Sequence, residues 1–311
     1  MEESLSSIFS KIDENRAVII DVTDTYFEGK SIDGEYRKGK DEKVKKLAQI
    51  ALVVTENRGF PLFHKTYGGN ISDRRIFTEM IYTLKERRYS STVMDRGFYS
   101  KKNIEDALAL KMNVICGVIR DREMRKILLA MDRRYIYSKE NRVSLKNTHV
   151  YIKSIDFMKG KLIAVYNPQL EQIRREHYYE HSSDEEVASL LGYSLIYDNT
   201  SLDDRDVVRK YYAKDTIERA FKHMKGVLSL RPVGVWLLSH VYAHIKTCYL
   251  SYAILSMLQY RIERTGISGE DALELLSGGY SVHLRDGETG FDWKTNVELS
   301  KKTGRDQEHG E

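Results

Sequence analysis

Residues 17–22, with the sequence AVIIDV, form an apolar run that carries Asp21 near its end, and this run decides the fold. It is typical of a buried strand. Residues 91–94 (STVM) repeat the pattern, and Asp95 follows them directly. In open α/β sheets ligands bind beyond the carboxyl ends of the strands, so we expect both carboxylates at such an edge. Two neighbouring carboxylates repel each other unless a cation lies between them, although either aspartate alone could simply end its strand.

The sequence around these strands alternates between strand and helix patterns. The patterns predict a hairpin of residues 49–55 and 60–67, followed by a helix at 73–87 and a strand at 91–94. A helix at 100–111 and a strand at 113–118 come next. Gly59 supplies the hairpin turn, and Ser72 or Asp73 and Ser100 can cap the two helices. This order predicts an α/β fold with a mixed sheet.

The second half of the chain begins with short alternating runs that predict a β-rich insertion, followed by a returning core strand at residues 193–197. A long helix from Ser201 to Arg231, a second helix over about 236–264 and a loose polar tail complete the pattern. The predicted organisation begins with a short N-terminal segment (1–16), a first core part (17–118) and the insertion (119–191). A second core part with the C-terminal helix (192–265) and the tail (266–311) follow.

Composition excludes several classes of protein. The chain has 311 residues, of which 41% are hydrophobic and 31% charged, as in ordinary globular proteins. No window approaches the roughly 18 apolar residues of a membrane span, and residues 1–16 lack the apolar core of a signal peptide, so we expect a cytoplasmic protein. Cys116 and Cys248 are far apart and suit two buried thiols better than a disulfide framework or a zinc site.

Charge is distributed unevenly, although the net charge is only +4. Residues 120–161 contain twelve Lys and Arg against five Asp and Glu. This basic segment is either a solvated surface or a track for DNA backbone phosphates. Aromatic residues in the same region could stack an unpaired base, but in short strands they usually pack within the sheet; they are Tyr135, Tyr137, Tyr151, Phe157 and Tyr166.

The predicted helix around Glu218 reads YYAKDTIERAFKHMK over residues 211–225. Intervals of 3, 4 and 7 residues place four polar side chains on one helical face: Tyr211, Lys214, Glu218 and Lys225. A glutamate there can complete a metal site with the two aspartates, and the cations can contact DNA phosphates. The alternative is a solvated Lys–Glu surface. A neighbouring apolar stripe anchors the helix, namely Ile217, Ala220 and Phe221.

With this spacing the sequence resembles the DDE transposases of bacterial and archaeal insertion sequences, in particular the large fourth family with a Tyr-Arg-Glu-Lys signature. This chain matches the signature at every interval, with Lys214 in place of the arginine, and lysine lacks the planar bidentate fork of arginine. Further blocks in the same order also resemble the family: Asp21-Val22-Thr23 with Tyr26-Phe27-Glu28, Gly69 to Asp73, Asp95 to Ser100, and Leu230 to Val233. The resemblance covers about residues 17–264.

The resemblance implies a ribonuclease H-like core whose mixed sheet is flanked by helices, with a β-rich insertion before the last core strand and helix. It implies Mg²⁺-dependent DNA cutting and joining with two ions, for which Mn²⁺ can substitute. Catalysis and metal binding are expected at Asp21, Asp95 and Glu218. DNA contacts are expected at Tyr211, Lys214 and Lys225. The expected partners are double-stranded DNA, as transposon ends and target, and a second copy in a homodimer on DNA, with no membrane.

Several alternatives remain open at this stage. Asp24 competes with Asp21 as a ligand, but it lies three residues further on, so strand alternation directs it to the other face. Relatives usually have a substantial region before the first aspartate, and this chain has only twenty residues there, so it is expected to lack that region. The chain is therefore an active transposase core, an inactive remnant that binds DNA or poisons other subunits, or a ribonuclease H-like nuclease.

Overall fold

The computed structural model describes most of the chain, at residues 2–13, 16–26, 36–38, 44–133, 136–180, 184–235, 237–277, 279–285 and 292–298. The chain divides into two compact units, Met1–Tyr252 and Ala253–Glu311. Within the described residues, no helix is both long enough and apolar enough to cross a bilayer.

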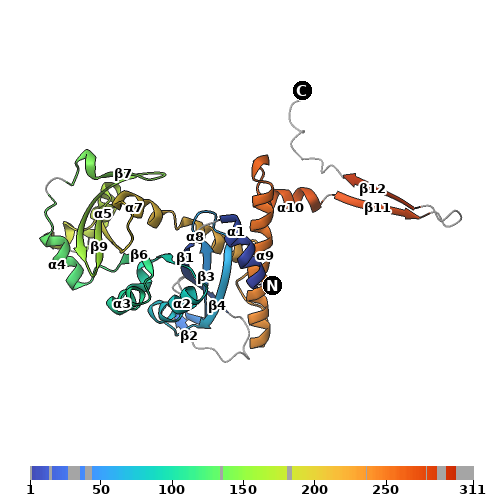
Figure 1. Ribbon diagram of the computed structural model, residues 1–311, viewed down its shortest axis with the longest axis horizontal. Helices are drawn as coiled ribbons and strands as arrows, with labels where there is room; N and C mark the ends of the chain where they lie inside the picture. The colour runs from blue at the N-terminus through green and yellow to red at the C-terminus, as the bar shows by residue number, and fades with distance from the viewer. Residues whose placement is uncertain are drawn as a thin grey trace, which may run out of the picture. The chain divides into compact units, whose positions relative to one another are not determined.

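Among the described residues, ten strands form one mixed sheet in the first unit (Figure 1). In spatial order they are β2 (Tyr36–Lys38), β3 (Val44–Thr55), β1 (Ala17–Tyr26), β5 (Ser91–Met94), β6 (Asn113–Val118), β10 (Tyr193–Asp198), β9 (Gly160–Tyr166), β8 (His149–Phe157) and β7 (Arg142–Ser144), with β4 (Pro61–Gly68) also paired to β3. Strands β1, β5 and β6 are parallel to one another, whereas β3 and β10 run antiparallel to their neighbours. The predicted mixed sheet is confirmed.

The described part of the chain also contains ten α-helices. They are α1 (Glu2–Asp13), α2 (Asp73–Glu86), α3 (Lys101–Ala109), α4 (Arg122–Ala130), α5 (Pro168–Tyr178), α6 (Glu185–Ala188), α7 (Asp204–Tyr212), α8 (Asp215–Lys225), α9 (Leu238–Arg261) and α10 (Gly269–Ser277). The predicted caps are confirmed, because the hydroxyls of Ser72 and Ser100 accept hydrogen bonds from backbone N–H groups in the first turns of α2 and α3.

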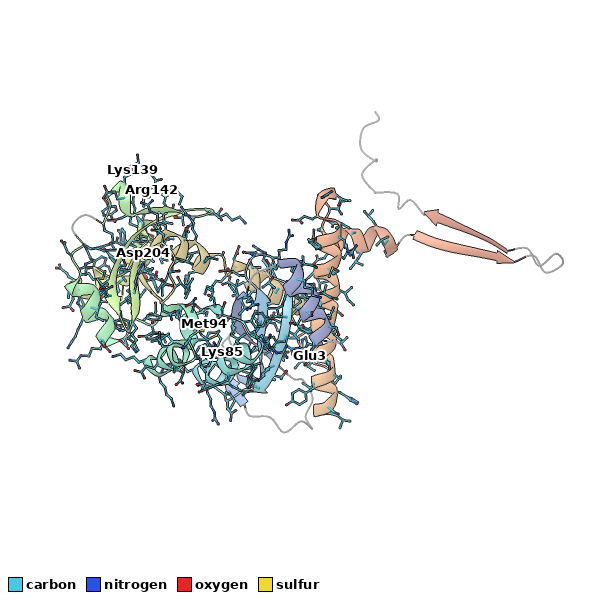
Figure 2. The ribbon with its side chains drawn as sticks, viewed as in Figure 1. Glu3, Lys85, Met94, Lys139, Arg142 and Asp204 are labelled. Atoms are coloured by element: carbon cyan, nitrogen blue, oxygen red, sulfur yellow. The ribbon has the colours of Figure 1, made fainter. Side chains whose placement is uncertain are left out.

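The insertion is not a separate sheet. Its strands β7, β8 and β9 continue the core sheet through β10, and the insertion also contains α4, α5 and α6. Asp204, the first residue of α7, contacts the insertion; it is labelled in Figure 2. This carboxylate accepts a hydrogen bond from Ser154 at 2.5 Å and pairs with the ammonium of Lys161 at 2.9 Å. The insertion and the helix that follows β10 are therefore linked by side-chain contacts.

The single helix predicted from Ser201 to Arg231 is wrong, because the structure has two helices, α7 and α8. Around Ala213 and Lys214 the backbone changes to i→i−3 hydrogen bonds, for example from Ile217 N–H to Lys214 O at 3.0 Å. Helix α7 packs on β6, β10 and the insertion strands, whereas α8 packs on β1. Since a sheet twists from strand to strand, one straight helix cannot follow both surfaces.

Both ends of the chain contain more regular structure than the sequence predicts. Residues 2–13 form α1, whose Phe9 is fully buried and stacks on Phe60 with ring centroids 4.7 Å apart. The predicted loose tail contains α10 and a hairpin of β11 (Gly279–Arg285) and β12 (Asp292–Glu298) in the second unit. Residues 299–311 lie outside the described residues.

One face of the sheet forms the core with α7, α8 and α9. The sheet contributes residues such as Ile19, Val93 and Ile115, and the helices contribute Val207, Val208, Ile217, Ala220, Phe221, Met224, Val241, Ile245 and Tyr249. The predicted apolar stripe of α8 is thereby confirmed. Because side chains alternate along a strand, the residues two positions after Ile19 and Val93 are directed to this same helix-covered face. Those residues are Asp21 and Asp95.

Candidate active site

The register of two parallel strands places Asp21 and Asp95 side by side. The last paired residues of β1 and β5 are Ile20 and Met94, the latter labelled in Figure 2. The two aspartates follow immediately, and both side chains are half-buried. Asp95 therefore lies directly beyond the end of β5, as predicted. The prediction that Asp21 lies at the end of its strand is wrong, because β1 continues to Tyr26 and pairs with β3 beyond Asp21.

Two side chains from the α7–α8 junction converge on one oxygen of Asp95. The Lys214 ammonium lies 2.7 Å from Oδ1, and the Tyr211 hydroxyl donates a hydrogen bond to the same atom at 3.2 Å. Burial by itself raises the pKa of Asp95, but the hydrogen bond and charge of Lys214 outweigh it, helped by the Arg96 backbone N–H and by Tyr211. The net pKa is lowered, so Asp95 is ionised at neutral pH.

Tyr211 is able to donate because its phenol keeps its proton. Burial and the charge of Asp95 both raise the pKa of Tyr211. The hydroxyl reaches Asp95 over Gly117 in β6, where a Cβ atom would lie only 2.3 Å from it. Gly117 was not among the residues singled out from the sequence, although an isolated glycine inside a strand signals close approach of another group.

The α7–α8 junction is held in place from the side of β3 as well. The Lys210 ammonium of α7 pairs with Glu56 at 2.7 Å, and the side chain of Glu56 is only 5% exposed. Gly59, with φ of 72°, brings the β3–β4 turn against Thr216, whose methyl group would lie 2.2 Å from an added Cβ. These contacts explain why Lys214 and Tyr211 reach Asp95 in the folded chain.

Asp24, the competing aspartate, lies in a different environment. It is buried, and its Oδ1 lies 3.9 Å from the ammonium of Lys225 and 3.9 Å from the guanidinium of Arg231. Lys225, which the sequence predicts to contact DNA, is therefore beside Asp24, at the far end of α8 from Lys214. Asp21, rather than Asp24, follows the last matched pair of β1 and β5 and so adjoins Asp95.

Glu218 lies in the first turn of α8, four residues after Lys214, and is exposed. The part of the chain that the structure describes contains no group of three His, Cys, Asp or Glu side chains arranged to hold a metal ion. The structure thus brings Asp95, Tyr211 and Lys214 together and places the backbone of Asp21 next to that of Asp95, whereas Glu218 forms no three-ligand group with the two aspartates among the described residues. Lys214 supplies a positive charge at Asp95.

Many cations of the basic segment have structural partners. Arg120 and Arg133 donate to the backbone carbonyls of Leu190 and Ser189, and Lys153 donates to that of Asp132. Of the aromatic residues considered for stacking, Tyr137 contacts the rings of Tyr151 and Tyr166, while Tyr135 lies outside the described residues. These contacts favour sheet packing over base stacking at those positions.

The remaining sequence motifs have mixed outcomes. Cys116 and Cys248 are free and buried, as predicted, and the Cys116 thiol donates to the backbone oxygen of Asp95 at 3.7 Å. Asp73 lies so close to Gly97 that a Cβ there would be 2.7 Å from its carboxylate, which joins two of the motif blocks in space. Phe27 and Glu28 of the first block lie outside the described residues.

Comparison with known proteins bears on the fold and the family. A search of curated proteins finds no match. Among solved structures, the chain resembles a piggyBac transposase synaptic complex with hairpin DNA, with a TM-score of 0.56 and 12% identity, over 85% of this chain and 52% of that one. A Mos1 mariner paired end complex with Mn also matches, with a TM-score of 0.22 and 8% identity, over 36% of this chain and 40% of that one.

The piggyBac likeness shows a shared ribonuclease H-like fold, and the chain spans about half the length of that transposase. The family comparison reaches further, because residues 13–254 match the Transposase DDE domain. This match includes Asp21, Asp95, the insertion and the α7–α8 junction. The chain therefore belongs to the family of proteins with a transposase DDE domain.

Proposed function

We propose that this chain is the catalytic core of an insertion-sequence transposase, which cuts and joins DNA strands with the help of divalent metal ions. The observation that carries the proposal is the register of β1 and β5, which sets Asp21 beside Asp95 under the α7–α8 junction. Membership of the transposase DDE family supports the same role.

The residues present suit a hard divalent cation. Asp21 and Asp95 offer only carboxylate oxygens, the ligand type that Mg²⁺ prefers, and Asp95 already binds one cation, the ammonium of Lys214. Asp21, Asp95 and Glu218 are the residues proposed to hold Mg²⁺ or, in its place, Mn²⁺. Ions held by these residues would supply Lewis-acid chemistry, the activation of a water or a DNA 3′-hydroxyl and the stabilisation of the leaving oxygen.

The side chains on Asp95 have a second role in this proposal. Lys214 can bind either the carboxylate of Asp95 or a phosphate oxygen of DNA, and Tyr211 can donate to either acceptor. An approaching phosphate therefore draws Lys214 away from Asp95 and frees a carboxylate oxygen. Lys225 is proposed to exchange Asp24 for a phosphate in the same way. The proposed partners are double-stranded DNA and a second copy of the chain on that DNA.

The finer assignment also remains a proposal. The signature spacing from Tyr211 to Lys225 favours the fourth family of insertion sequences, with Lys214 in the position of the arginine. A lysine binds a phosphate as a point charge and lacks the bidentate geometry of arginine. We therefore expect Lys214 to bind the phosphate more weakly than an arginine would. We also expect the protein to act on DNA in the cytoplasm.

A second function is favoured by one observation. Lys214 engages Asp95, and the described residues form no three-ligand metal group. A chain fixed in this arrangement would bind DNA without cutting it, and would act only by interfering with active relatives.

Cleavage of duplex DNA by the purified chain separates the two functions. With Mg²⁺ or Mn²⁺ we expect strand cleavage or strand transfer, which Asp95→Asn and Glu218→Gln should abolish because the amide loses the charge that holds the metal. The matched control is Glu86→Gln, an exposed glutamate at the end of α2. A chain that binds DNA and metal but never cuts supports the second function, and an Asp95→Asn variant with wild-type activity rules out the proposed site.

A further inference from the structure

A pocket of about 500 Å³ lies between the insertion and the α7–α8 junction. Two stretches of chain line it, the β7–β8 turn and the helices α7 and α8; the lining residues are Ser144, Leu145, Lys146, Asn147, Thr148, Arg209, Tyr212, Ala213, Asp215 and Arg219. Tyr212, Ala213 and Asp215 immediately neighbour Tyr211 and Lys214, the residues that contact Asp95. The pocket therefore adjoins the candidate active site through one short segment of chain.

The insertion side of the pocket is a tight turn with a cation at its tip. The Leu145 N–H donates to the Thr148 carbonyl at 2.8 Å and closes the turn, so Lys146 and Asn147 form the tip. Both side chains are exposed, and neither has a hydrogen-bond or ion-pair partner among the described residues. The Lys146 ammonium is thus available to an external anion without the loss of an internal contact.

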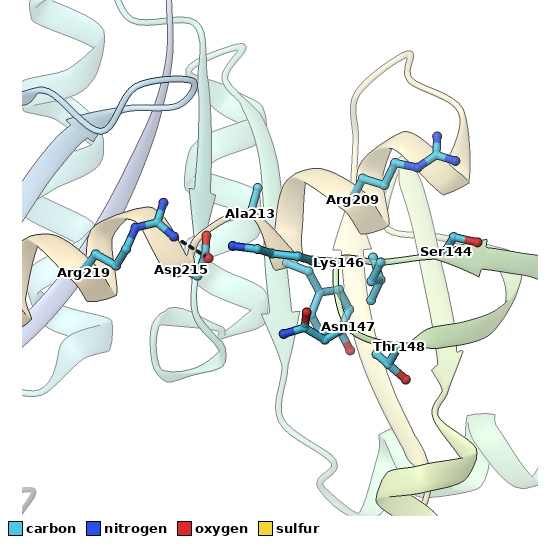
Figure 3. A pocket seen from close by; sticks show the side chains of 10 residues that line it. Ser144, Lys146, Asn147, Thr148, Arg209, Ala213, Asp215 and Arg219 are labelled. Carbon is cyan, nitrogen blue, oxygen red and sulfur yellow. Dashed lines mark hydrogen bonds and ion pairs between the residues drawn. The ribbon is translucent and has the colours of Figure 1, made fainter. Parts of the chain in front are cut away.

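The helix side of the pocket presents a guanidinium that is already oriented. Asp215 holds Arg219 at 2.7 Å, and the Thr216 hydroxyl accepts a hydrogen bond from it at 3.3 Å. Figure 3 shows Lys146 extending toward Asp215, so a cation from each side approaches the same region. The lining contains three cations, Lys146, Arg209 and Arg219, and the carboxylate of Asp215. Because Arg209 also pairs with Asp206 at 2.9 Å, the local charge is +1.

We propose that this pocket binds a backbone phosphate of duplex DNA, held by Lys146 and Arg219 next to the active site. The inference rests on the proposed function only in taking DNA as the ligand. Cations, an amide and hydroxyl groups around a half-open space suit a phosphodiester and its sugar, and they carry no information about base sequence. The pocket would set the position of the DNA strand relative to Asp21 and Asp95.

The charges that line the pocket predict opposite effects on DNA binding for substitutions at Lys146 and Asp215. Lys146→Ala removes a cation from the phosphate and should weaken binding. Asp215→Asn removes the negative charge from the lining, while the amide oxygen can still accept the hydrogen bond from Arg219, so this variant should bind more tightly. A role for these residues in packing alone would weaken binding in both variants or in neither.

The test is duplex binding by the full chain, measured by fluorescence anisotropy over a range of NaCl concentrations with EDTA present, so that no cleavage is required. We expect Lys146→Ala to flatten the slope of log affinity against log salt by about one, because one phosphate contact is lost. Lys139→Ala, which removes an exposed cation on the same insertion but outside the pocket, should keep the wild-type slope (Lys139 is labelled in Figure 2).

Equal slopes for Lys146→Ala and Lys139→Ala would overturn the inference, as would weaker binding by Asp215→Asn with an unchanged melting temperature. A wild-type chain that does not bind the duplex overturns it as well. Absence of DNA cleavage bears on the proposed function alone, because the binding assay contains no metal.

Discussion

Replacing Lys214 by methionine separates two effects that the structure combines at one atom. The Lys214 ammonium occupies Oδ1 of Asp95, and under the proposed function a divalent ion would have to compete with it for that atom. The Lys214→Met chain keeps a side chain of similar length without the charge, so Asp95 becomes available to the metal. We expect this variant to bind Mn²⁺ more tightly than the wild type, and to bind DNA more weakly.

The size of the effect follows from the ion pair. At 2.7 Å, opposite unit charges attract by about 1.5 kcal/mol in bulk water and about 6 kcal/mol at an effective dielectric constant of about 20. The side chains of Lys214 and Asp95 are 20% and 42% exposed, so solvent screening places the contribution near the lower limit. A contribution of about 1–2 kcal/mol corresponds to metal binding that is roughly 5–30-fold tighter.

Isothermal titration of the metal-free chain with Mn²⁺ measures this directly. Lys222→Met is the matched control, because Lys222 is an exposed lysine of the same helix that has no partner among the described residues. A Lys214→Met chain that binds Mn²⁺ no more tightly than Lys222→Met would refute competition between Lys214 and a metal at Asp95.

Three further predictions concern the surroundings of Asp95. Gly117→Ala should destabilise the fold by about 1–3 kcal/mol, because its Cβ meets the Tyr211 hydroxyl, and thermal unfolding should show a smaller cost in a Tyr211→Phe background. Because burial raises the pKa of the Cys116 thiol and no part of it reaches solvent, iodoacetamide at mildly alkaline pH should label it only after unfolding, and rapid labelling of the folded chain would contradict this packing. The lowered pKa of Asp95 stabilises the fold at pH values above the ordinary carboxyl pKa, and this stabilisation is lost as the pH falls through the lowered pKa. Below about pH 4 the unfolding free energy of the wild type should therefore fall more steeply with pH than that of Lys214→Met. Parallel curves of unfolding free energy against pH would count against the ion pair.

The parts of the fold that the sequence predicts well are those with a strong local signal. The strand around Asp21, the hairpin with its turn at Gly59 and the capped helices after Ser72 and Ser100 all carry periodicity or turn chemistry that acts over a few residues. The position of Asp95 just beyond β5 was also predictable from the apolar run before it, whereas β1 continues past Asp21 to Tyr26 because β3 pairs with it as far as that residue.

The parts that the sequence does not predict depend on contacts between distant residues. Helix propensity continues through Ala213 and Lys214, and only the packing of α7 and α8 on different strands breaks the helix there. Helix α1 buries one aromatic residue, Phe9, which is too weak a pattern to recognise. The spacing from Tyr211 to Lys225 suggests one common face, whereas the structure gives Lys214 and Lys225 different carboxylate partners, Asp95 and Asp24.

Metal binding by single-residue variants tests the central claim most directly. Titration with Mn²⁺ should show that Asp21→Asn, Asp95→Asn and Glu218→Gln each lose metal affinity, because each removes a charged ligand. Asp24→Asn should keep wild-type affinity, because the carboxylate of Asp24 lies beside Lys225 and Arg231. Melting temperatures establish that each variant is folded. Loss of metal binding in Asp24→Asn together with wild-type binding in Asp21→Asn, or wild-type binding in Glu218→Gln, would contradict the proposed site.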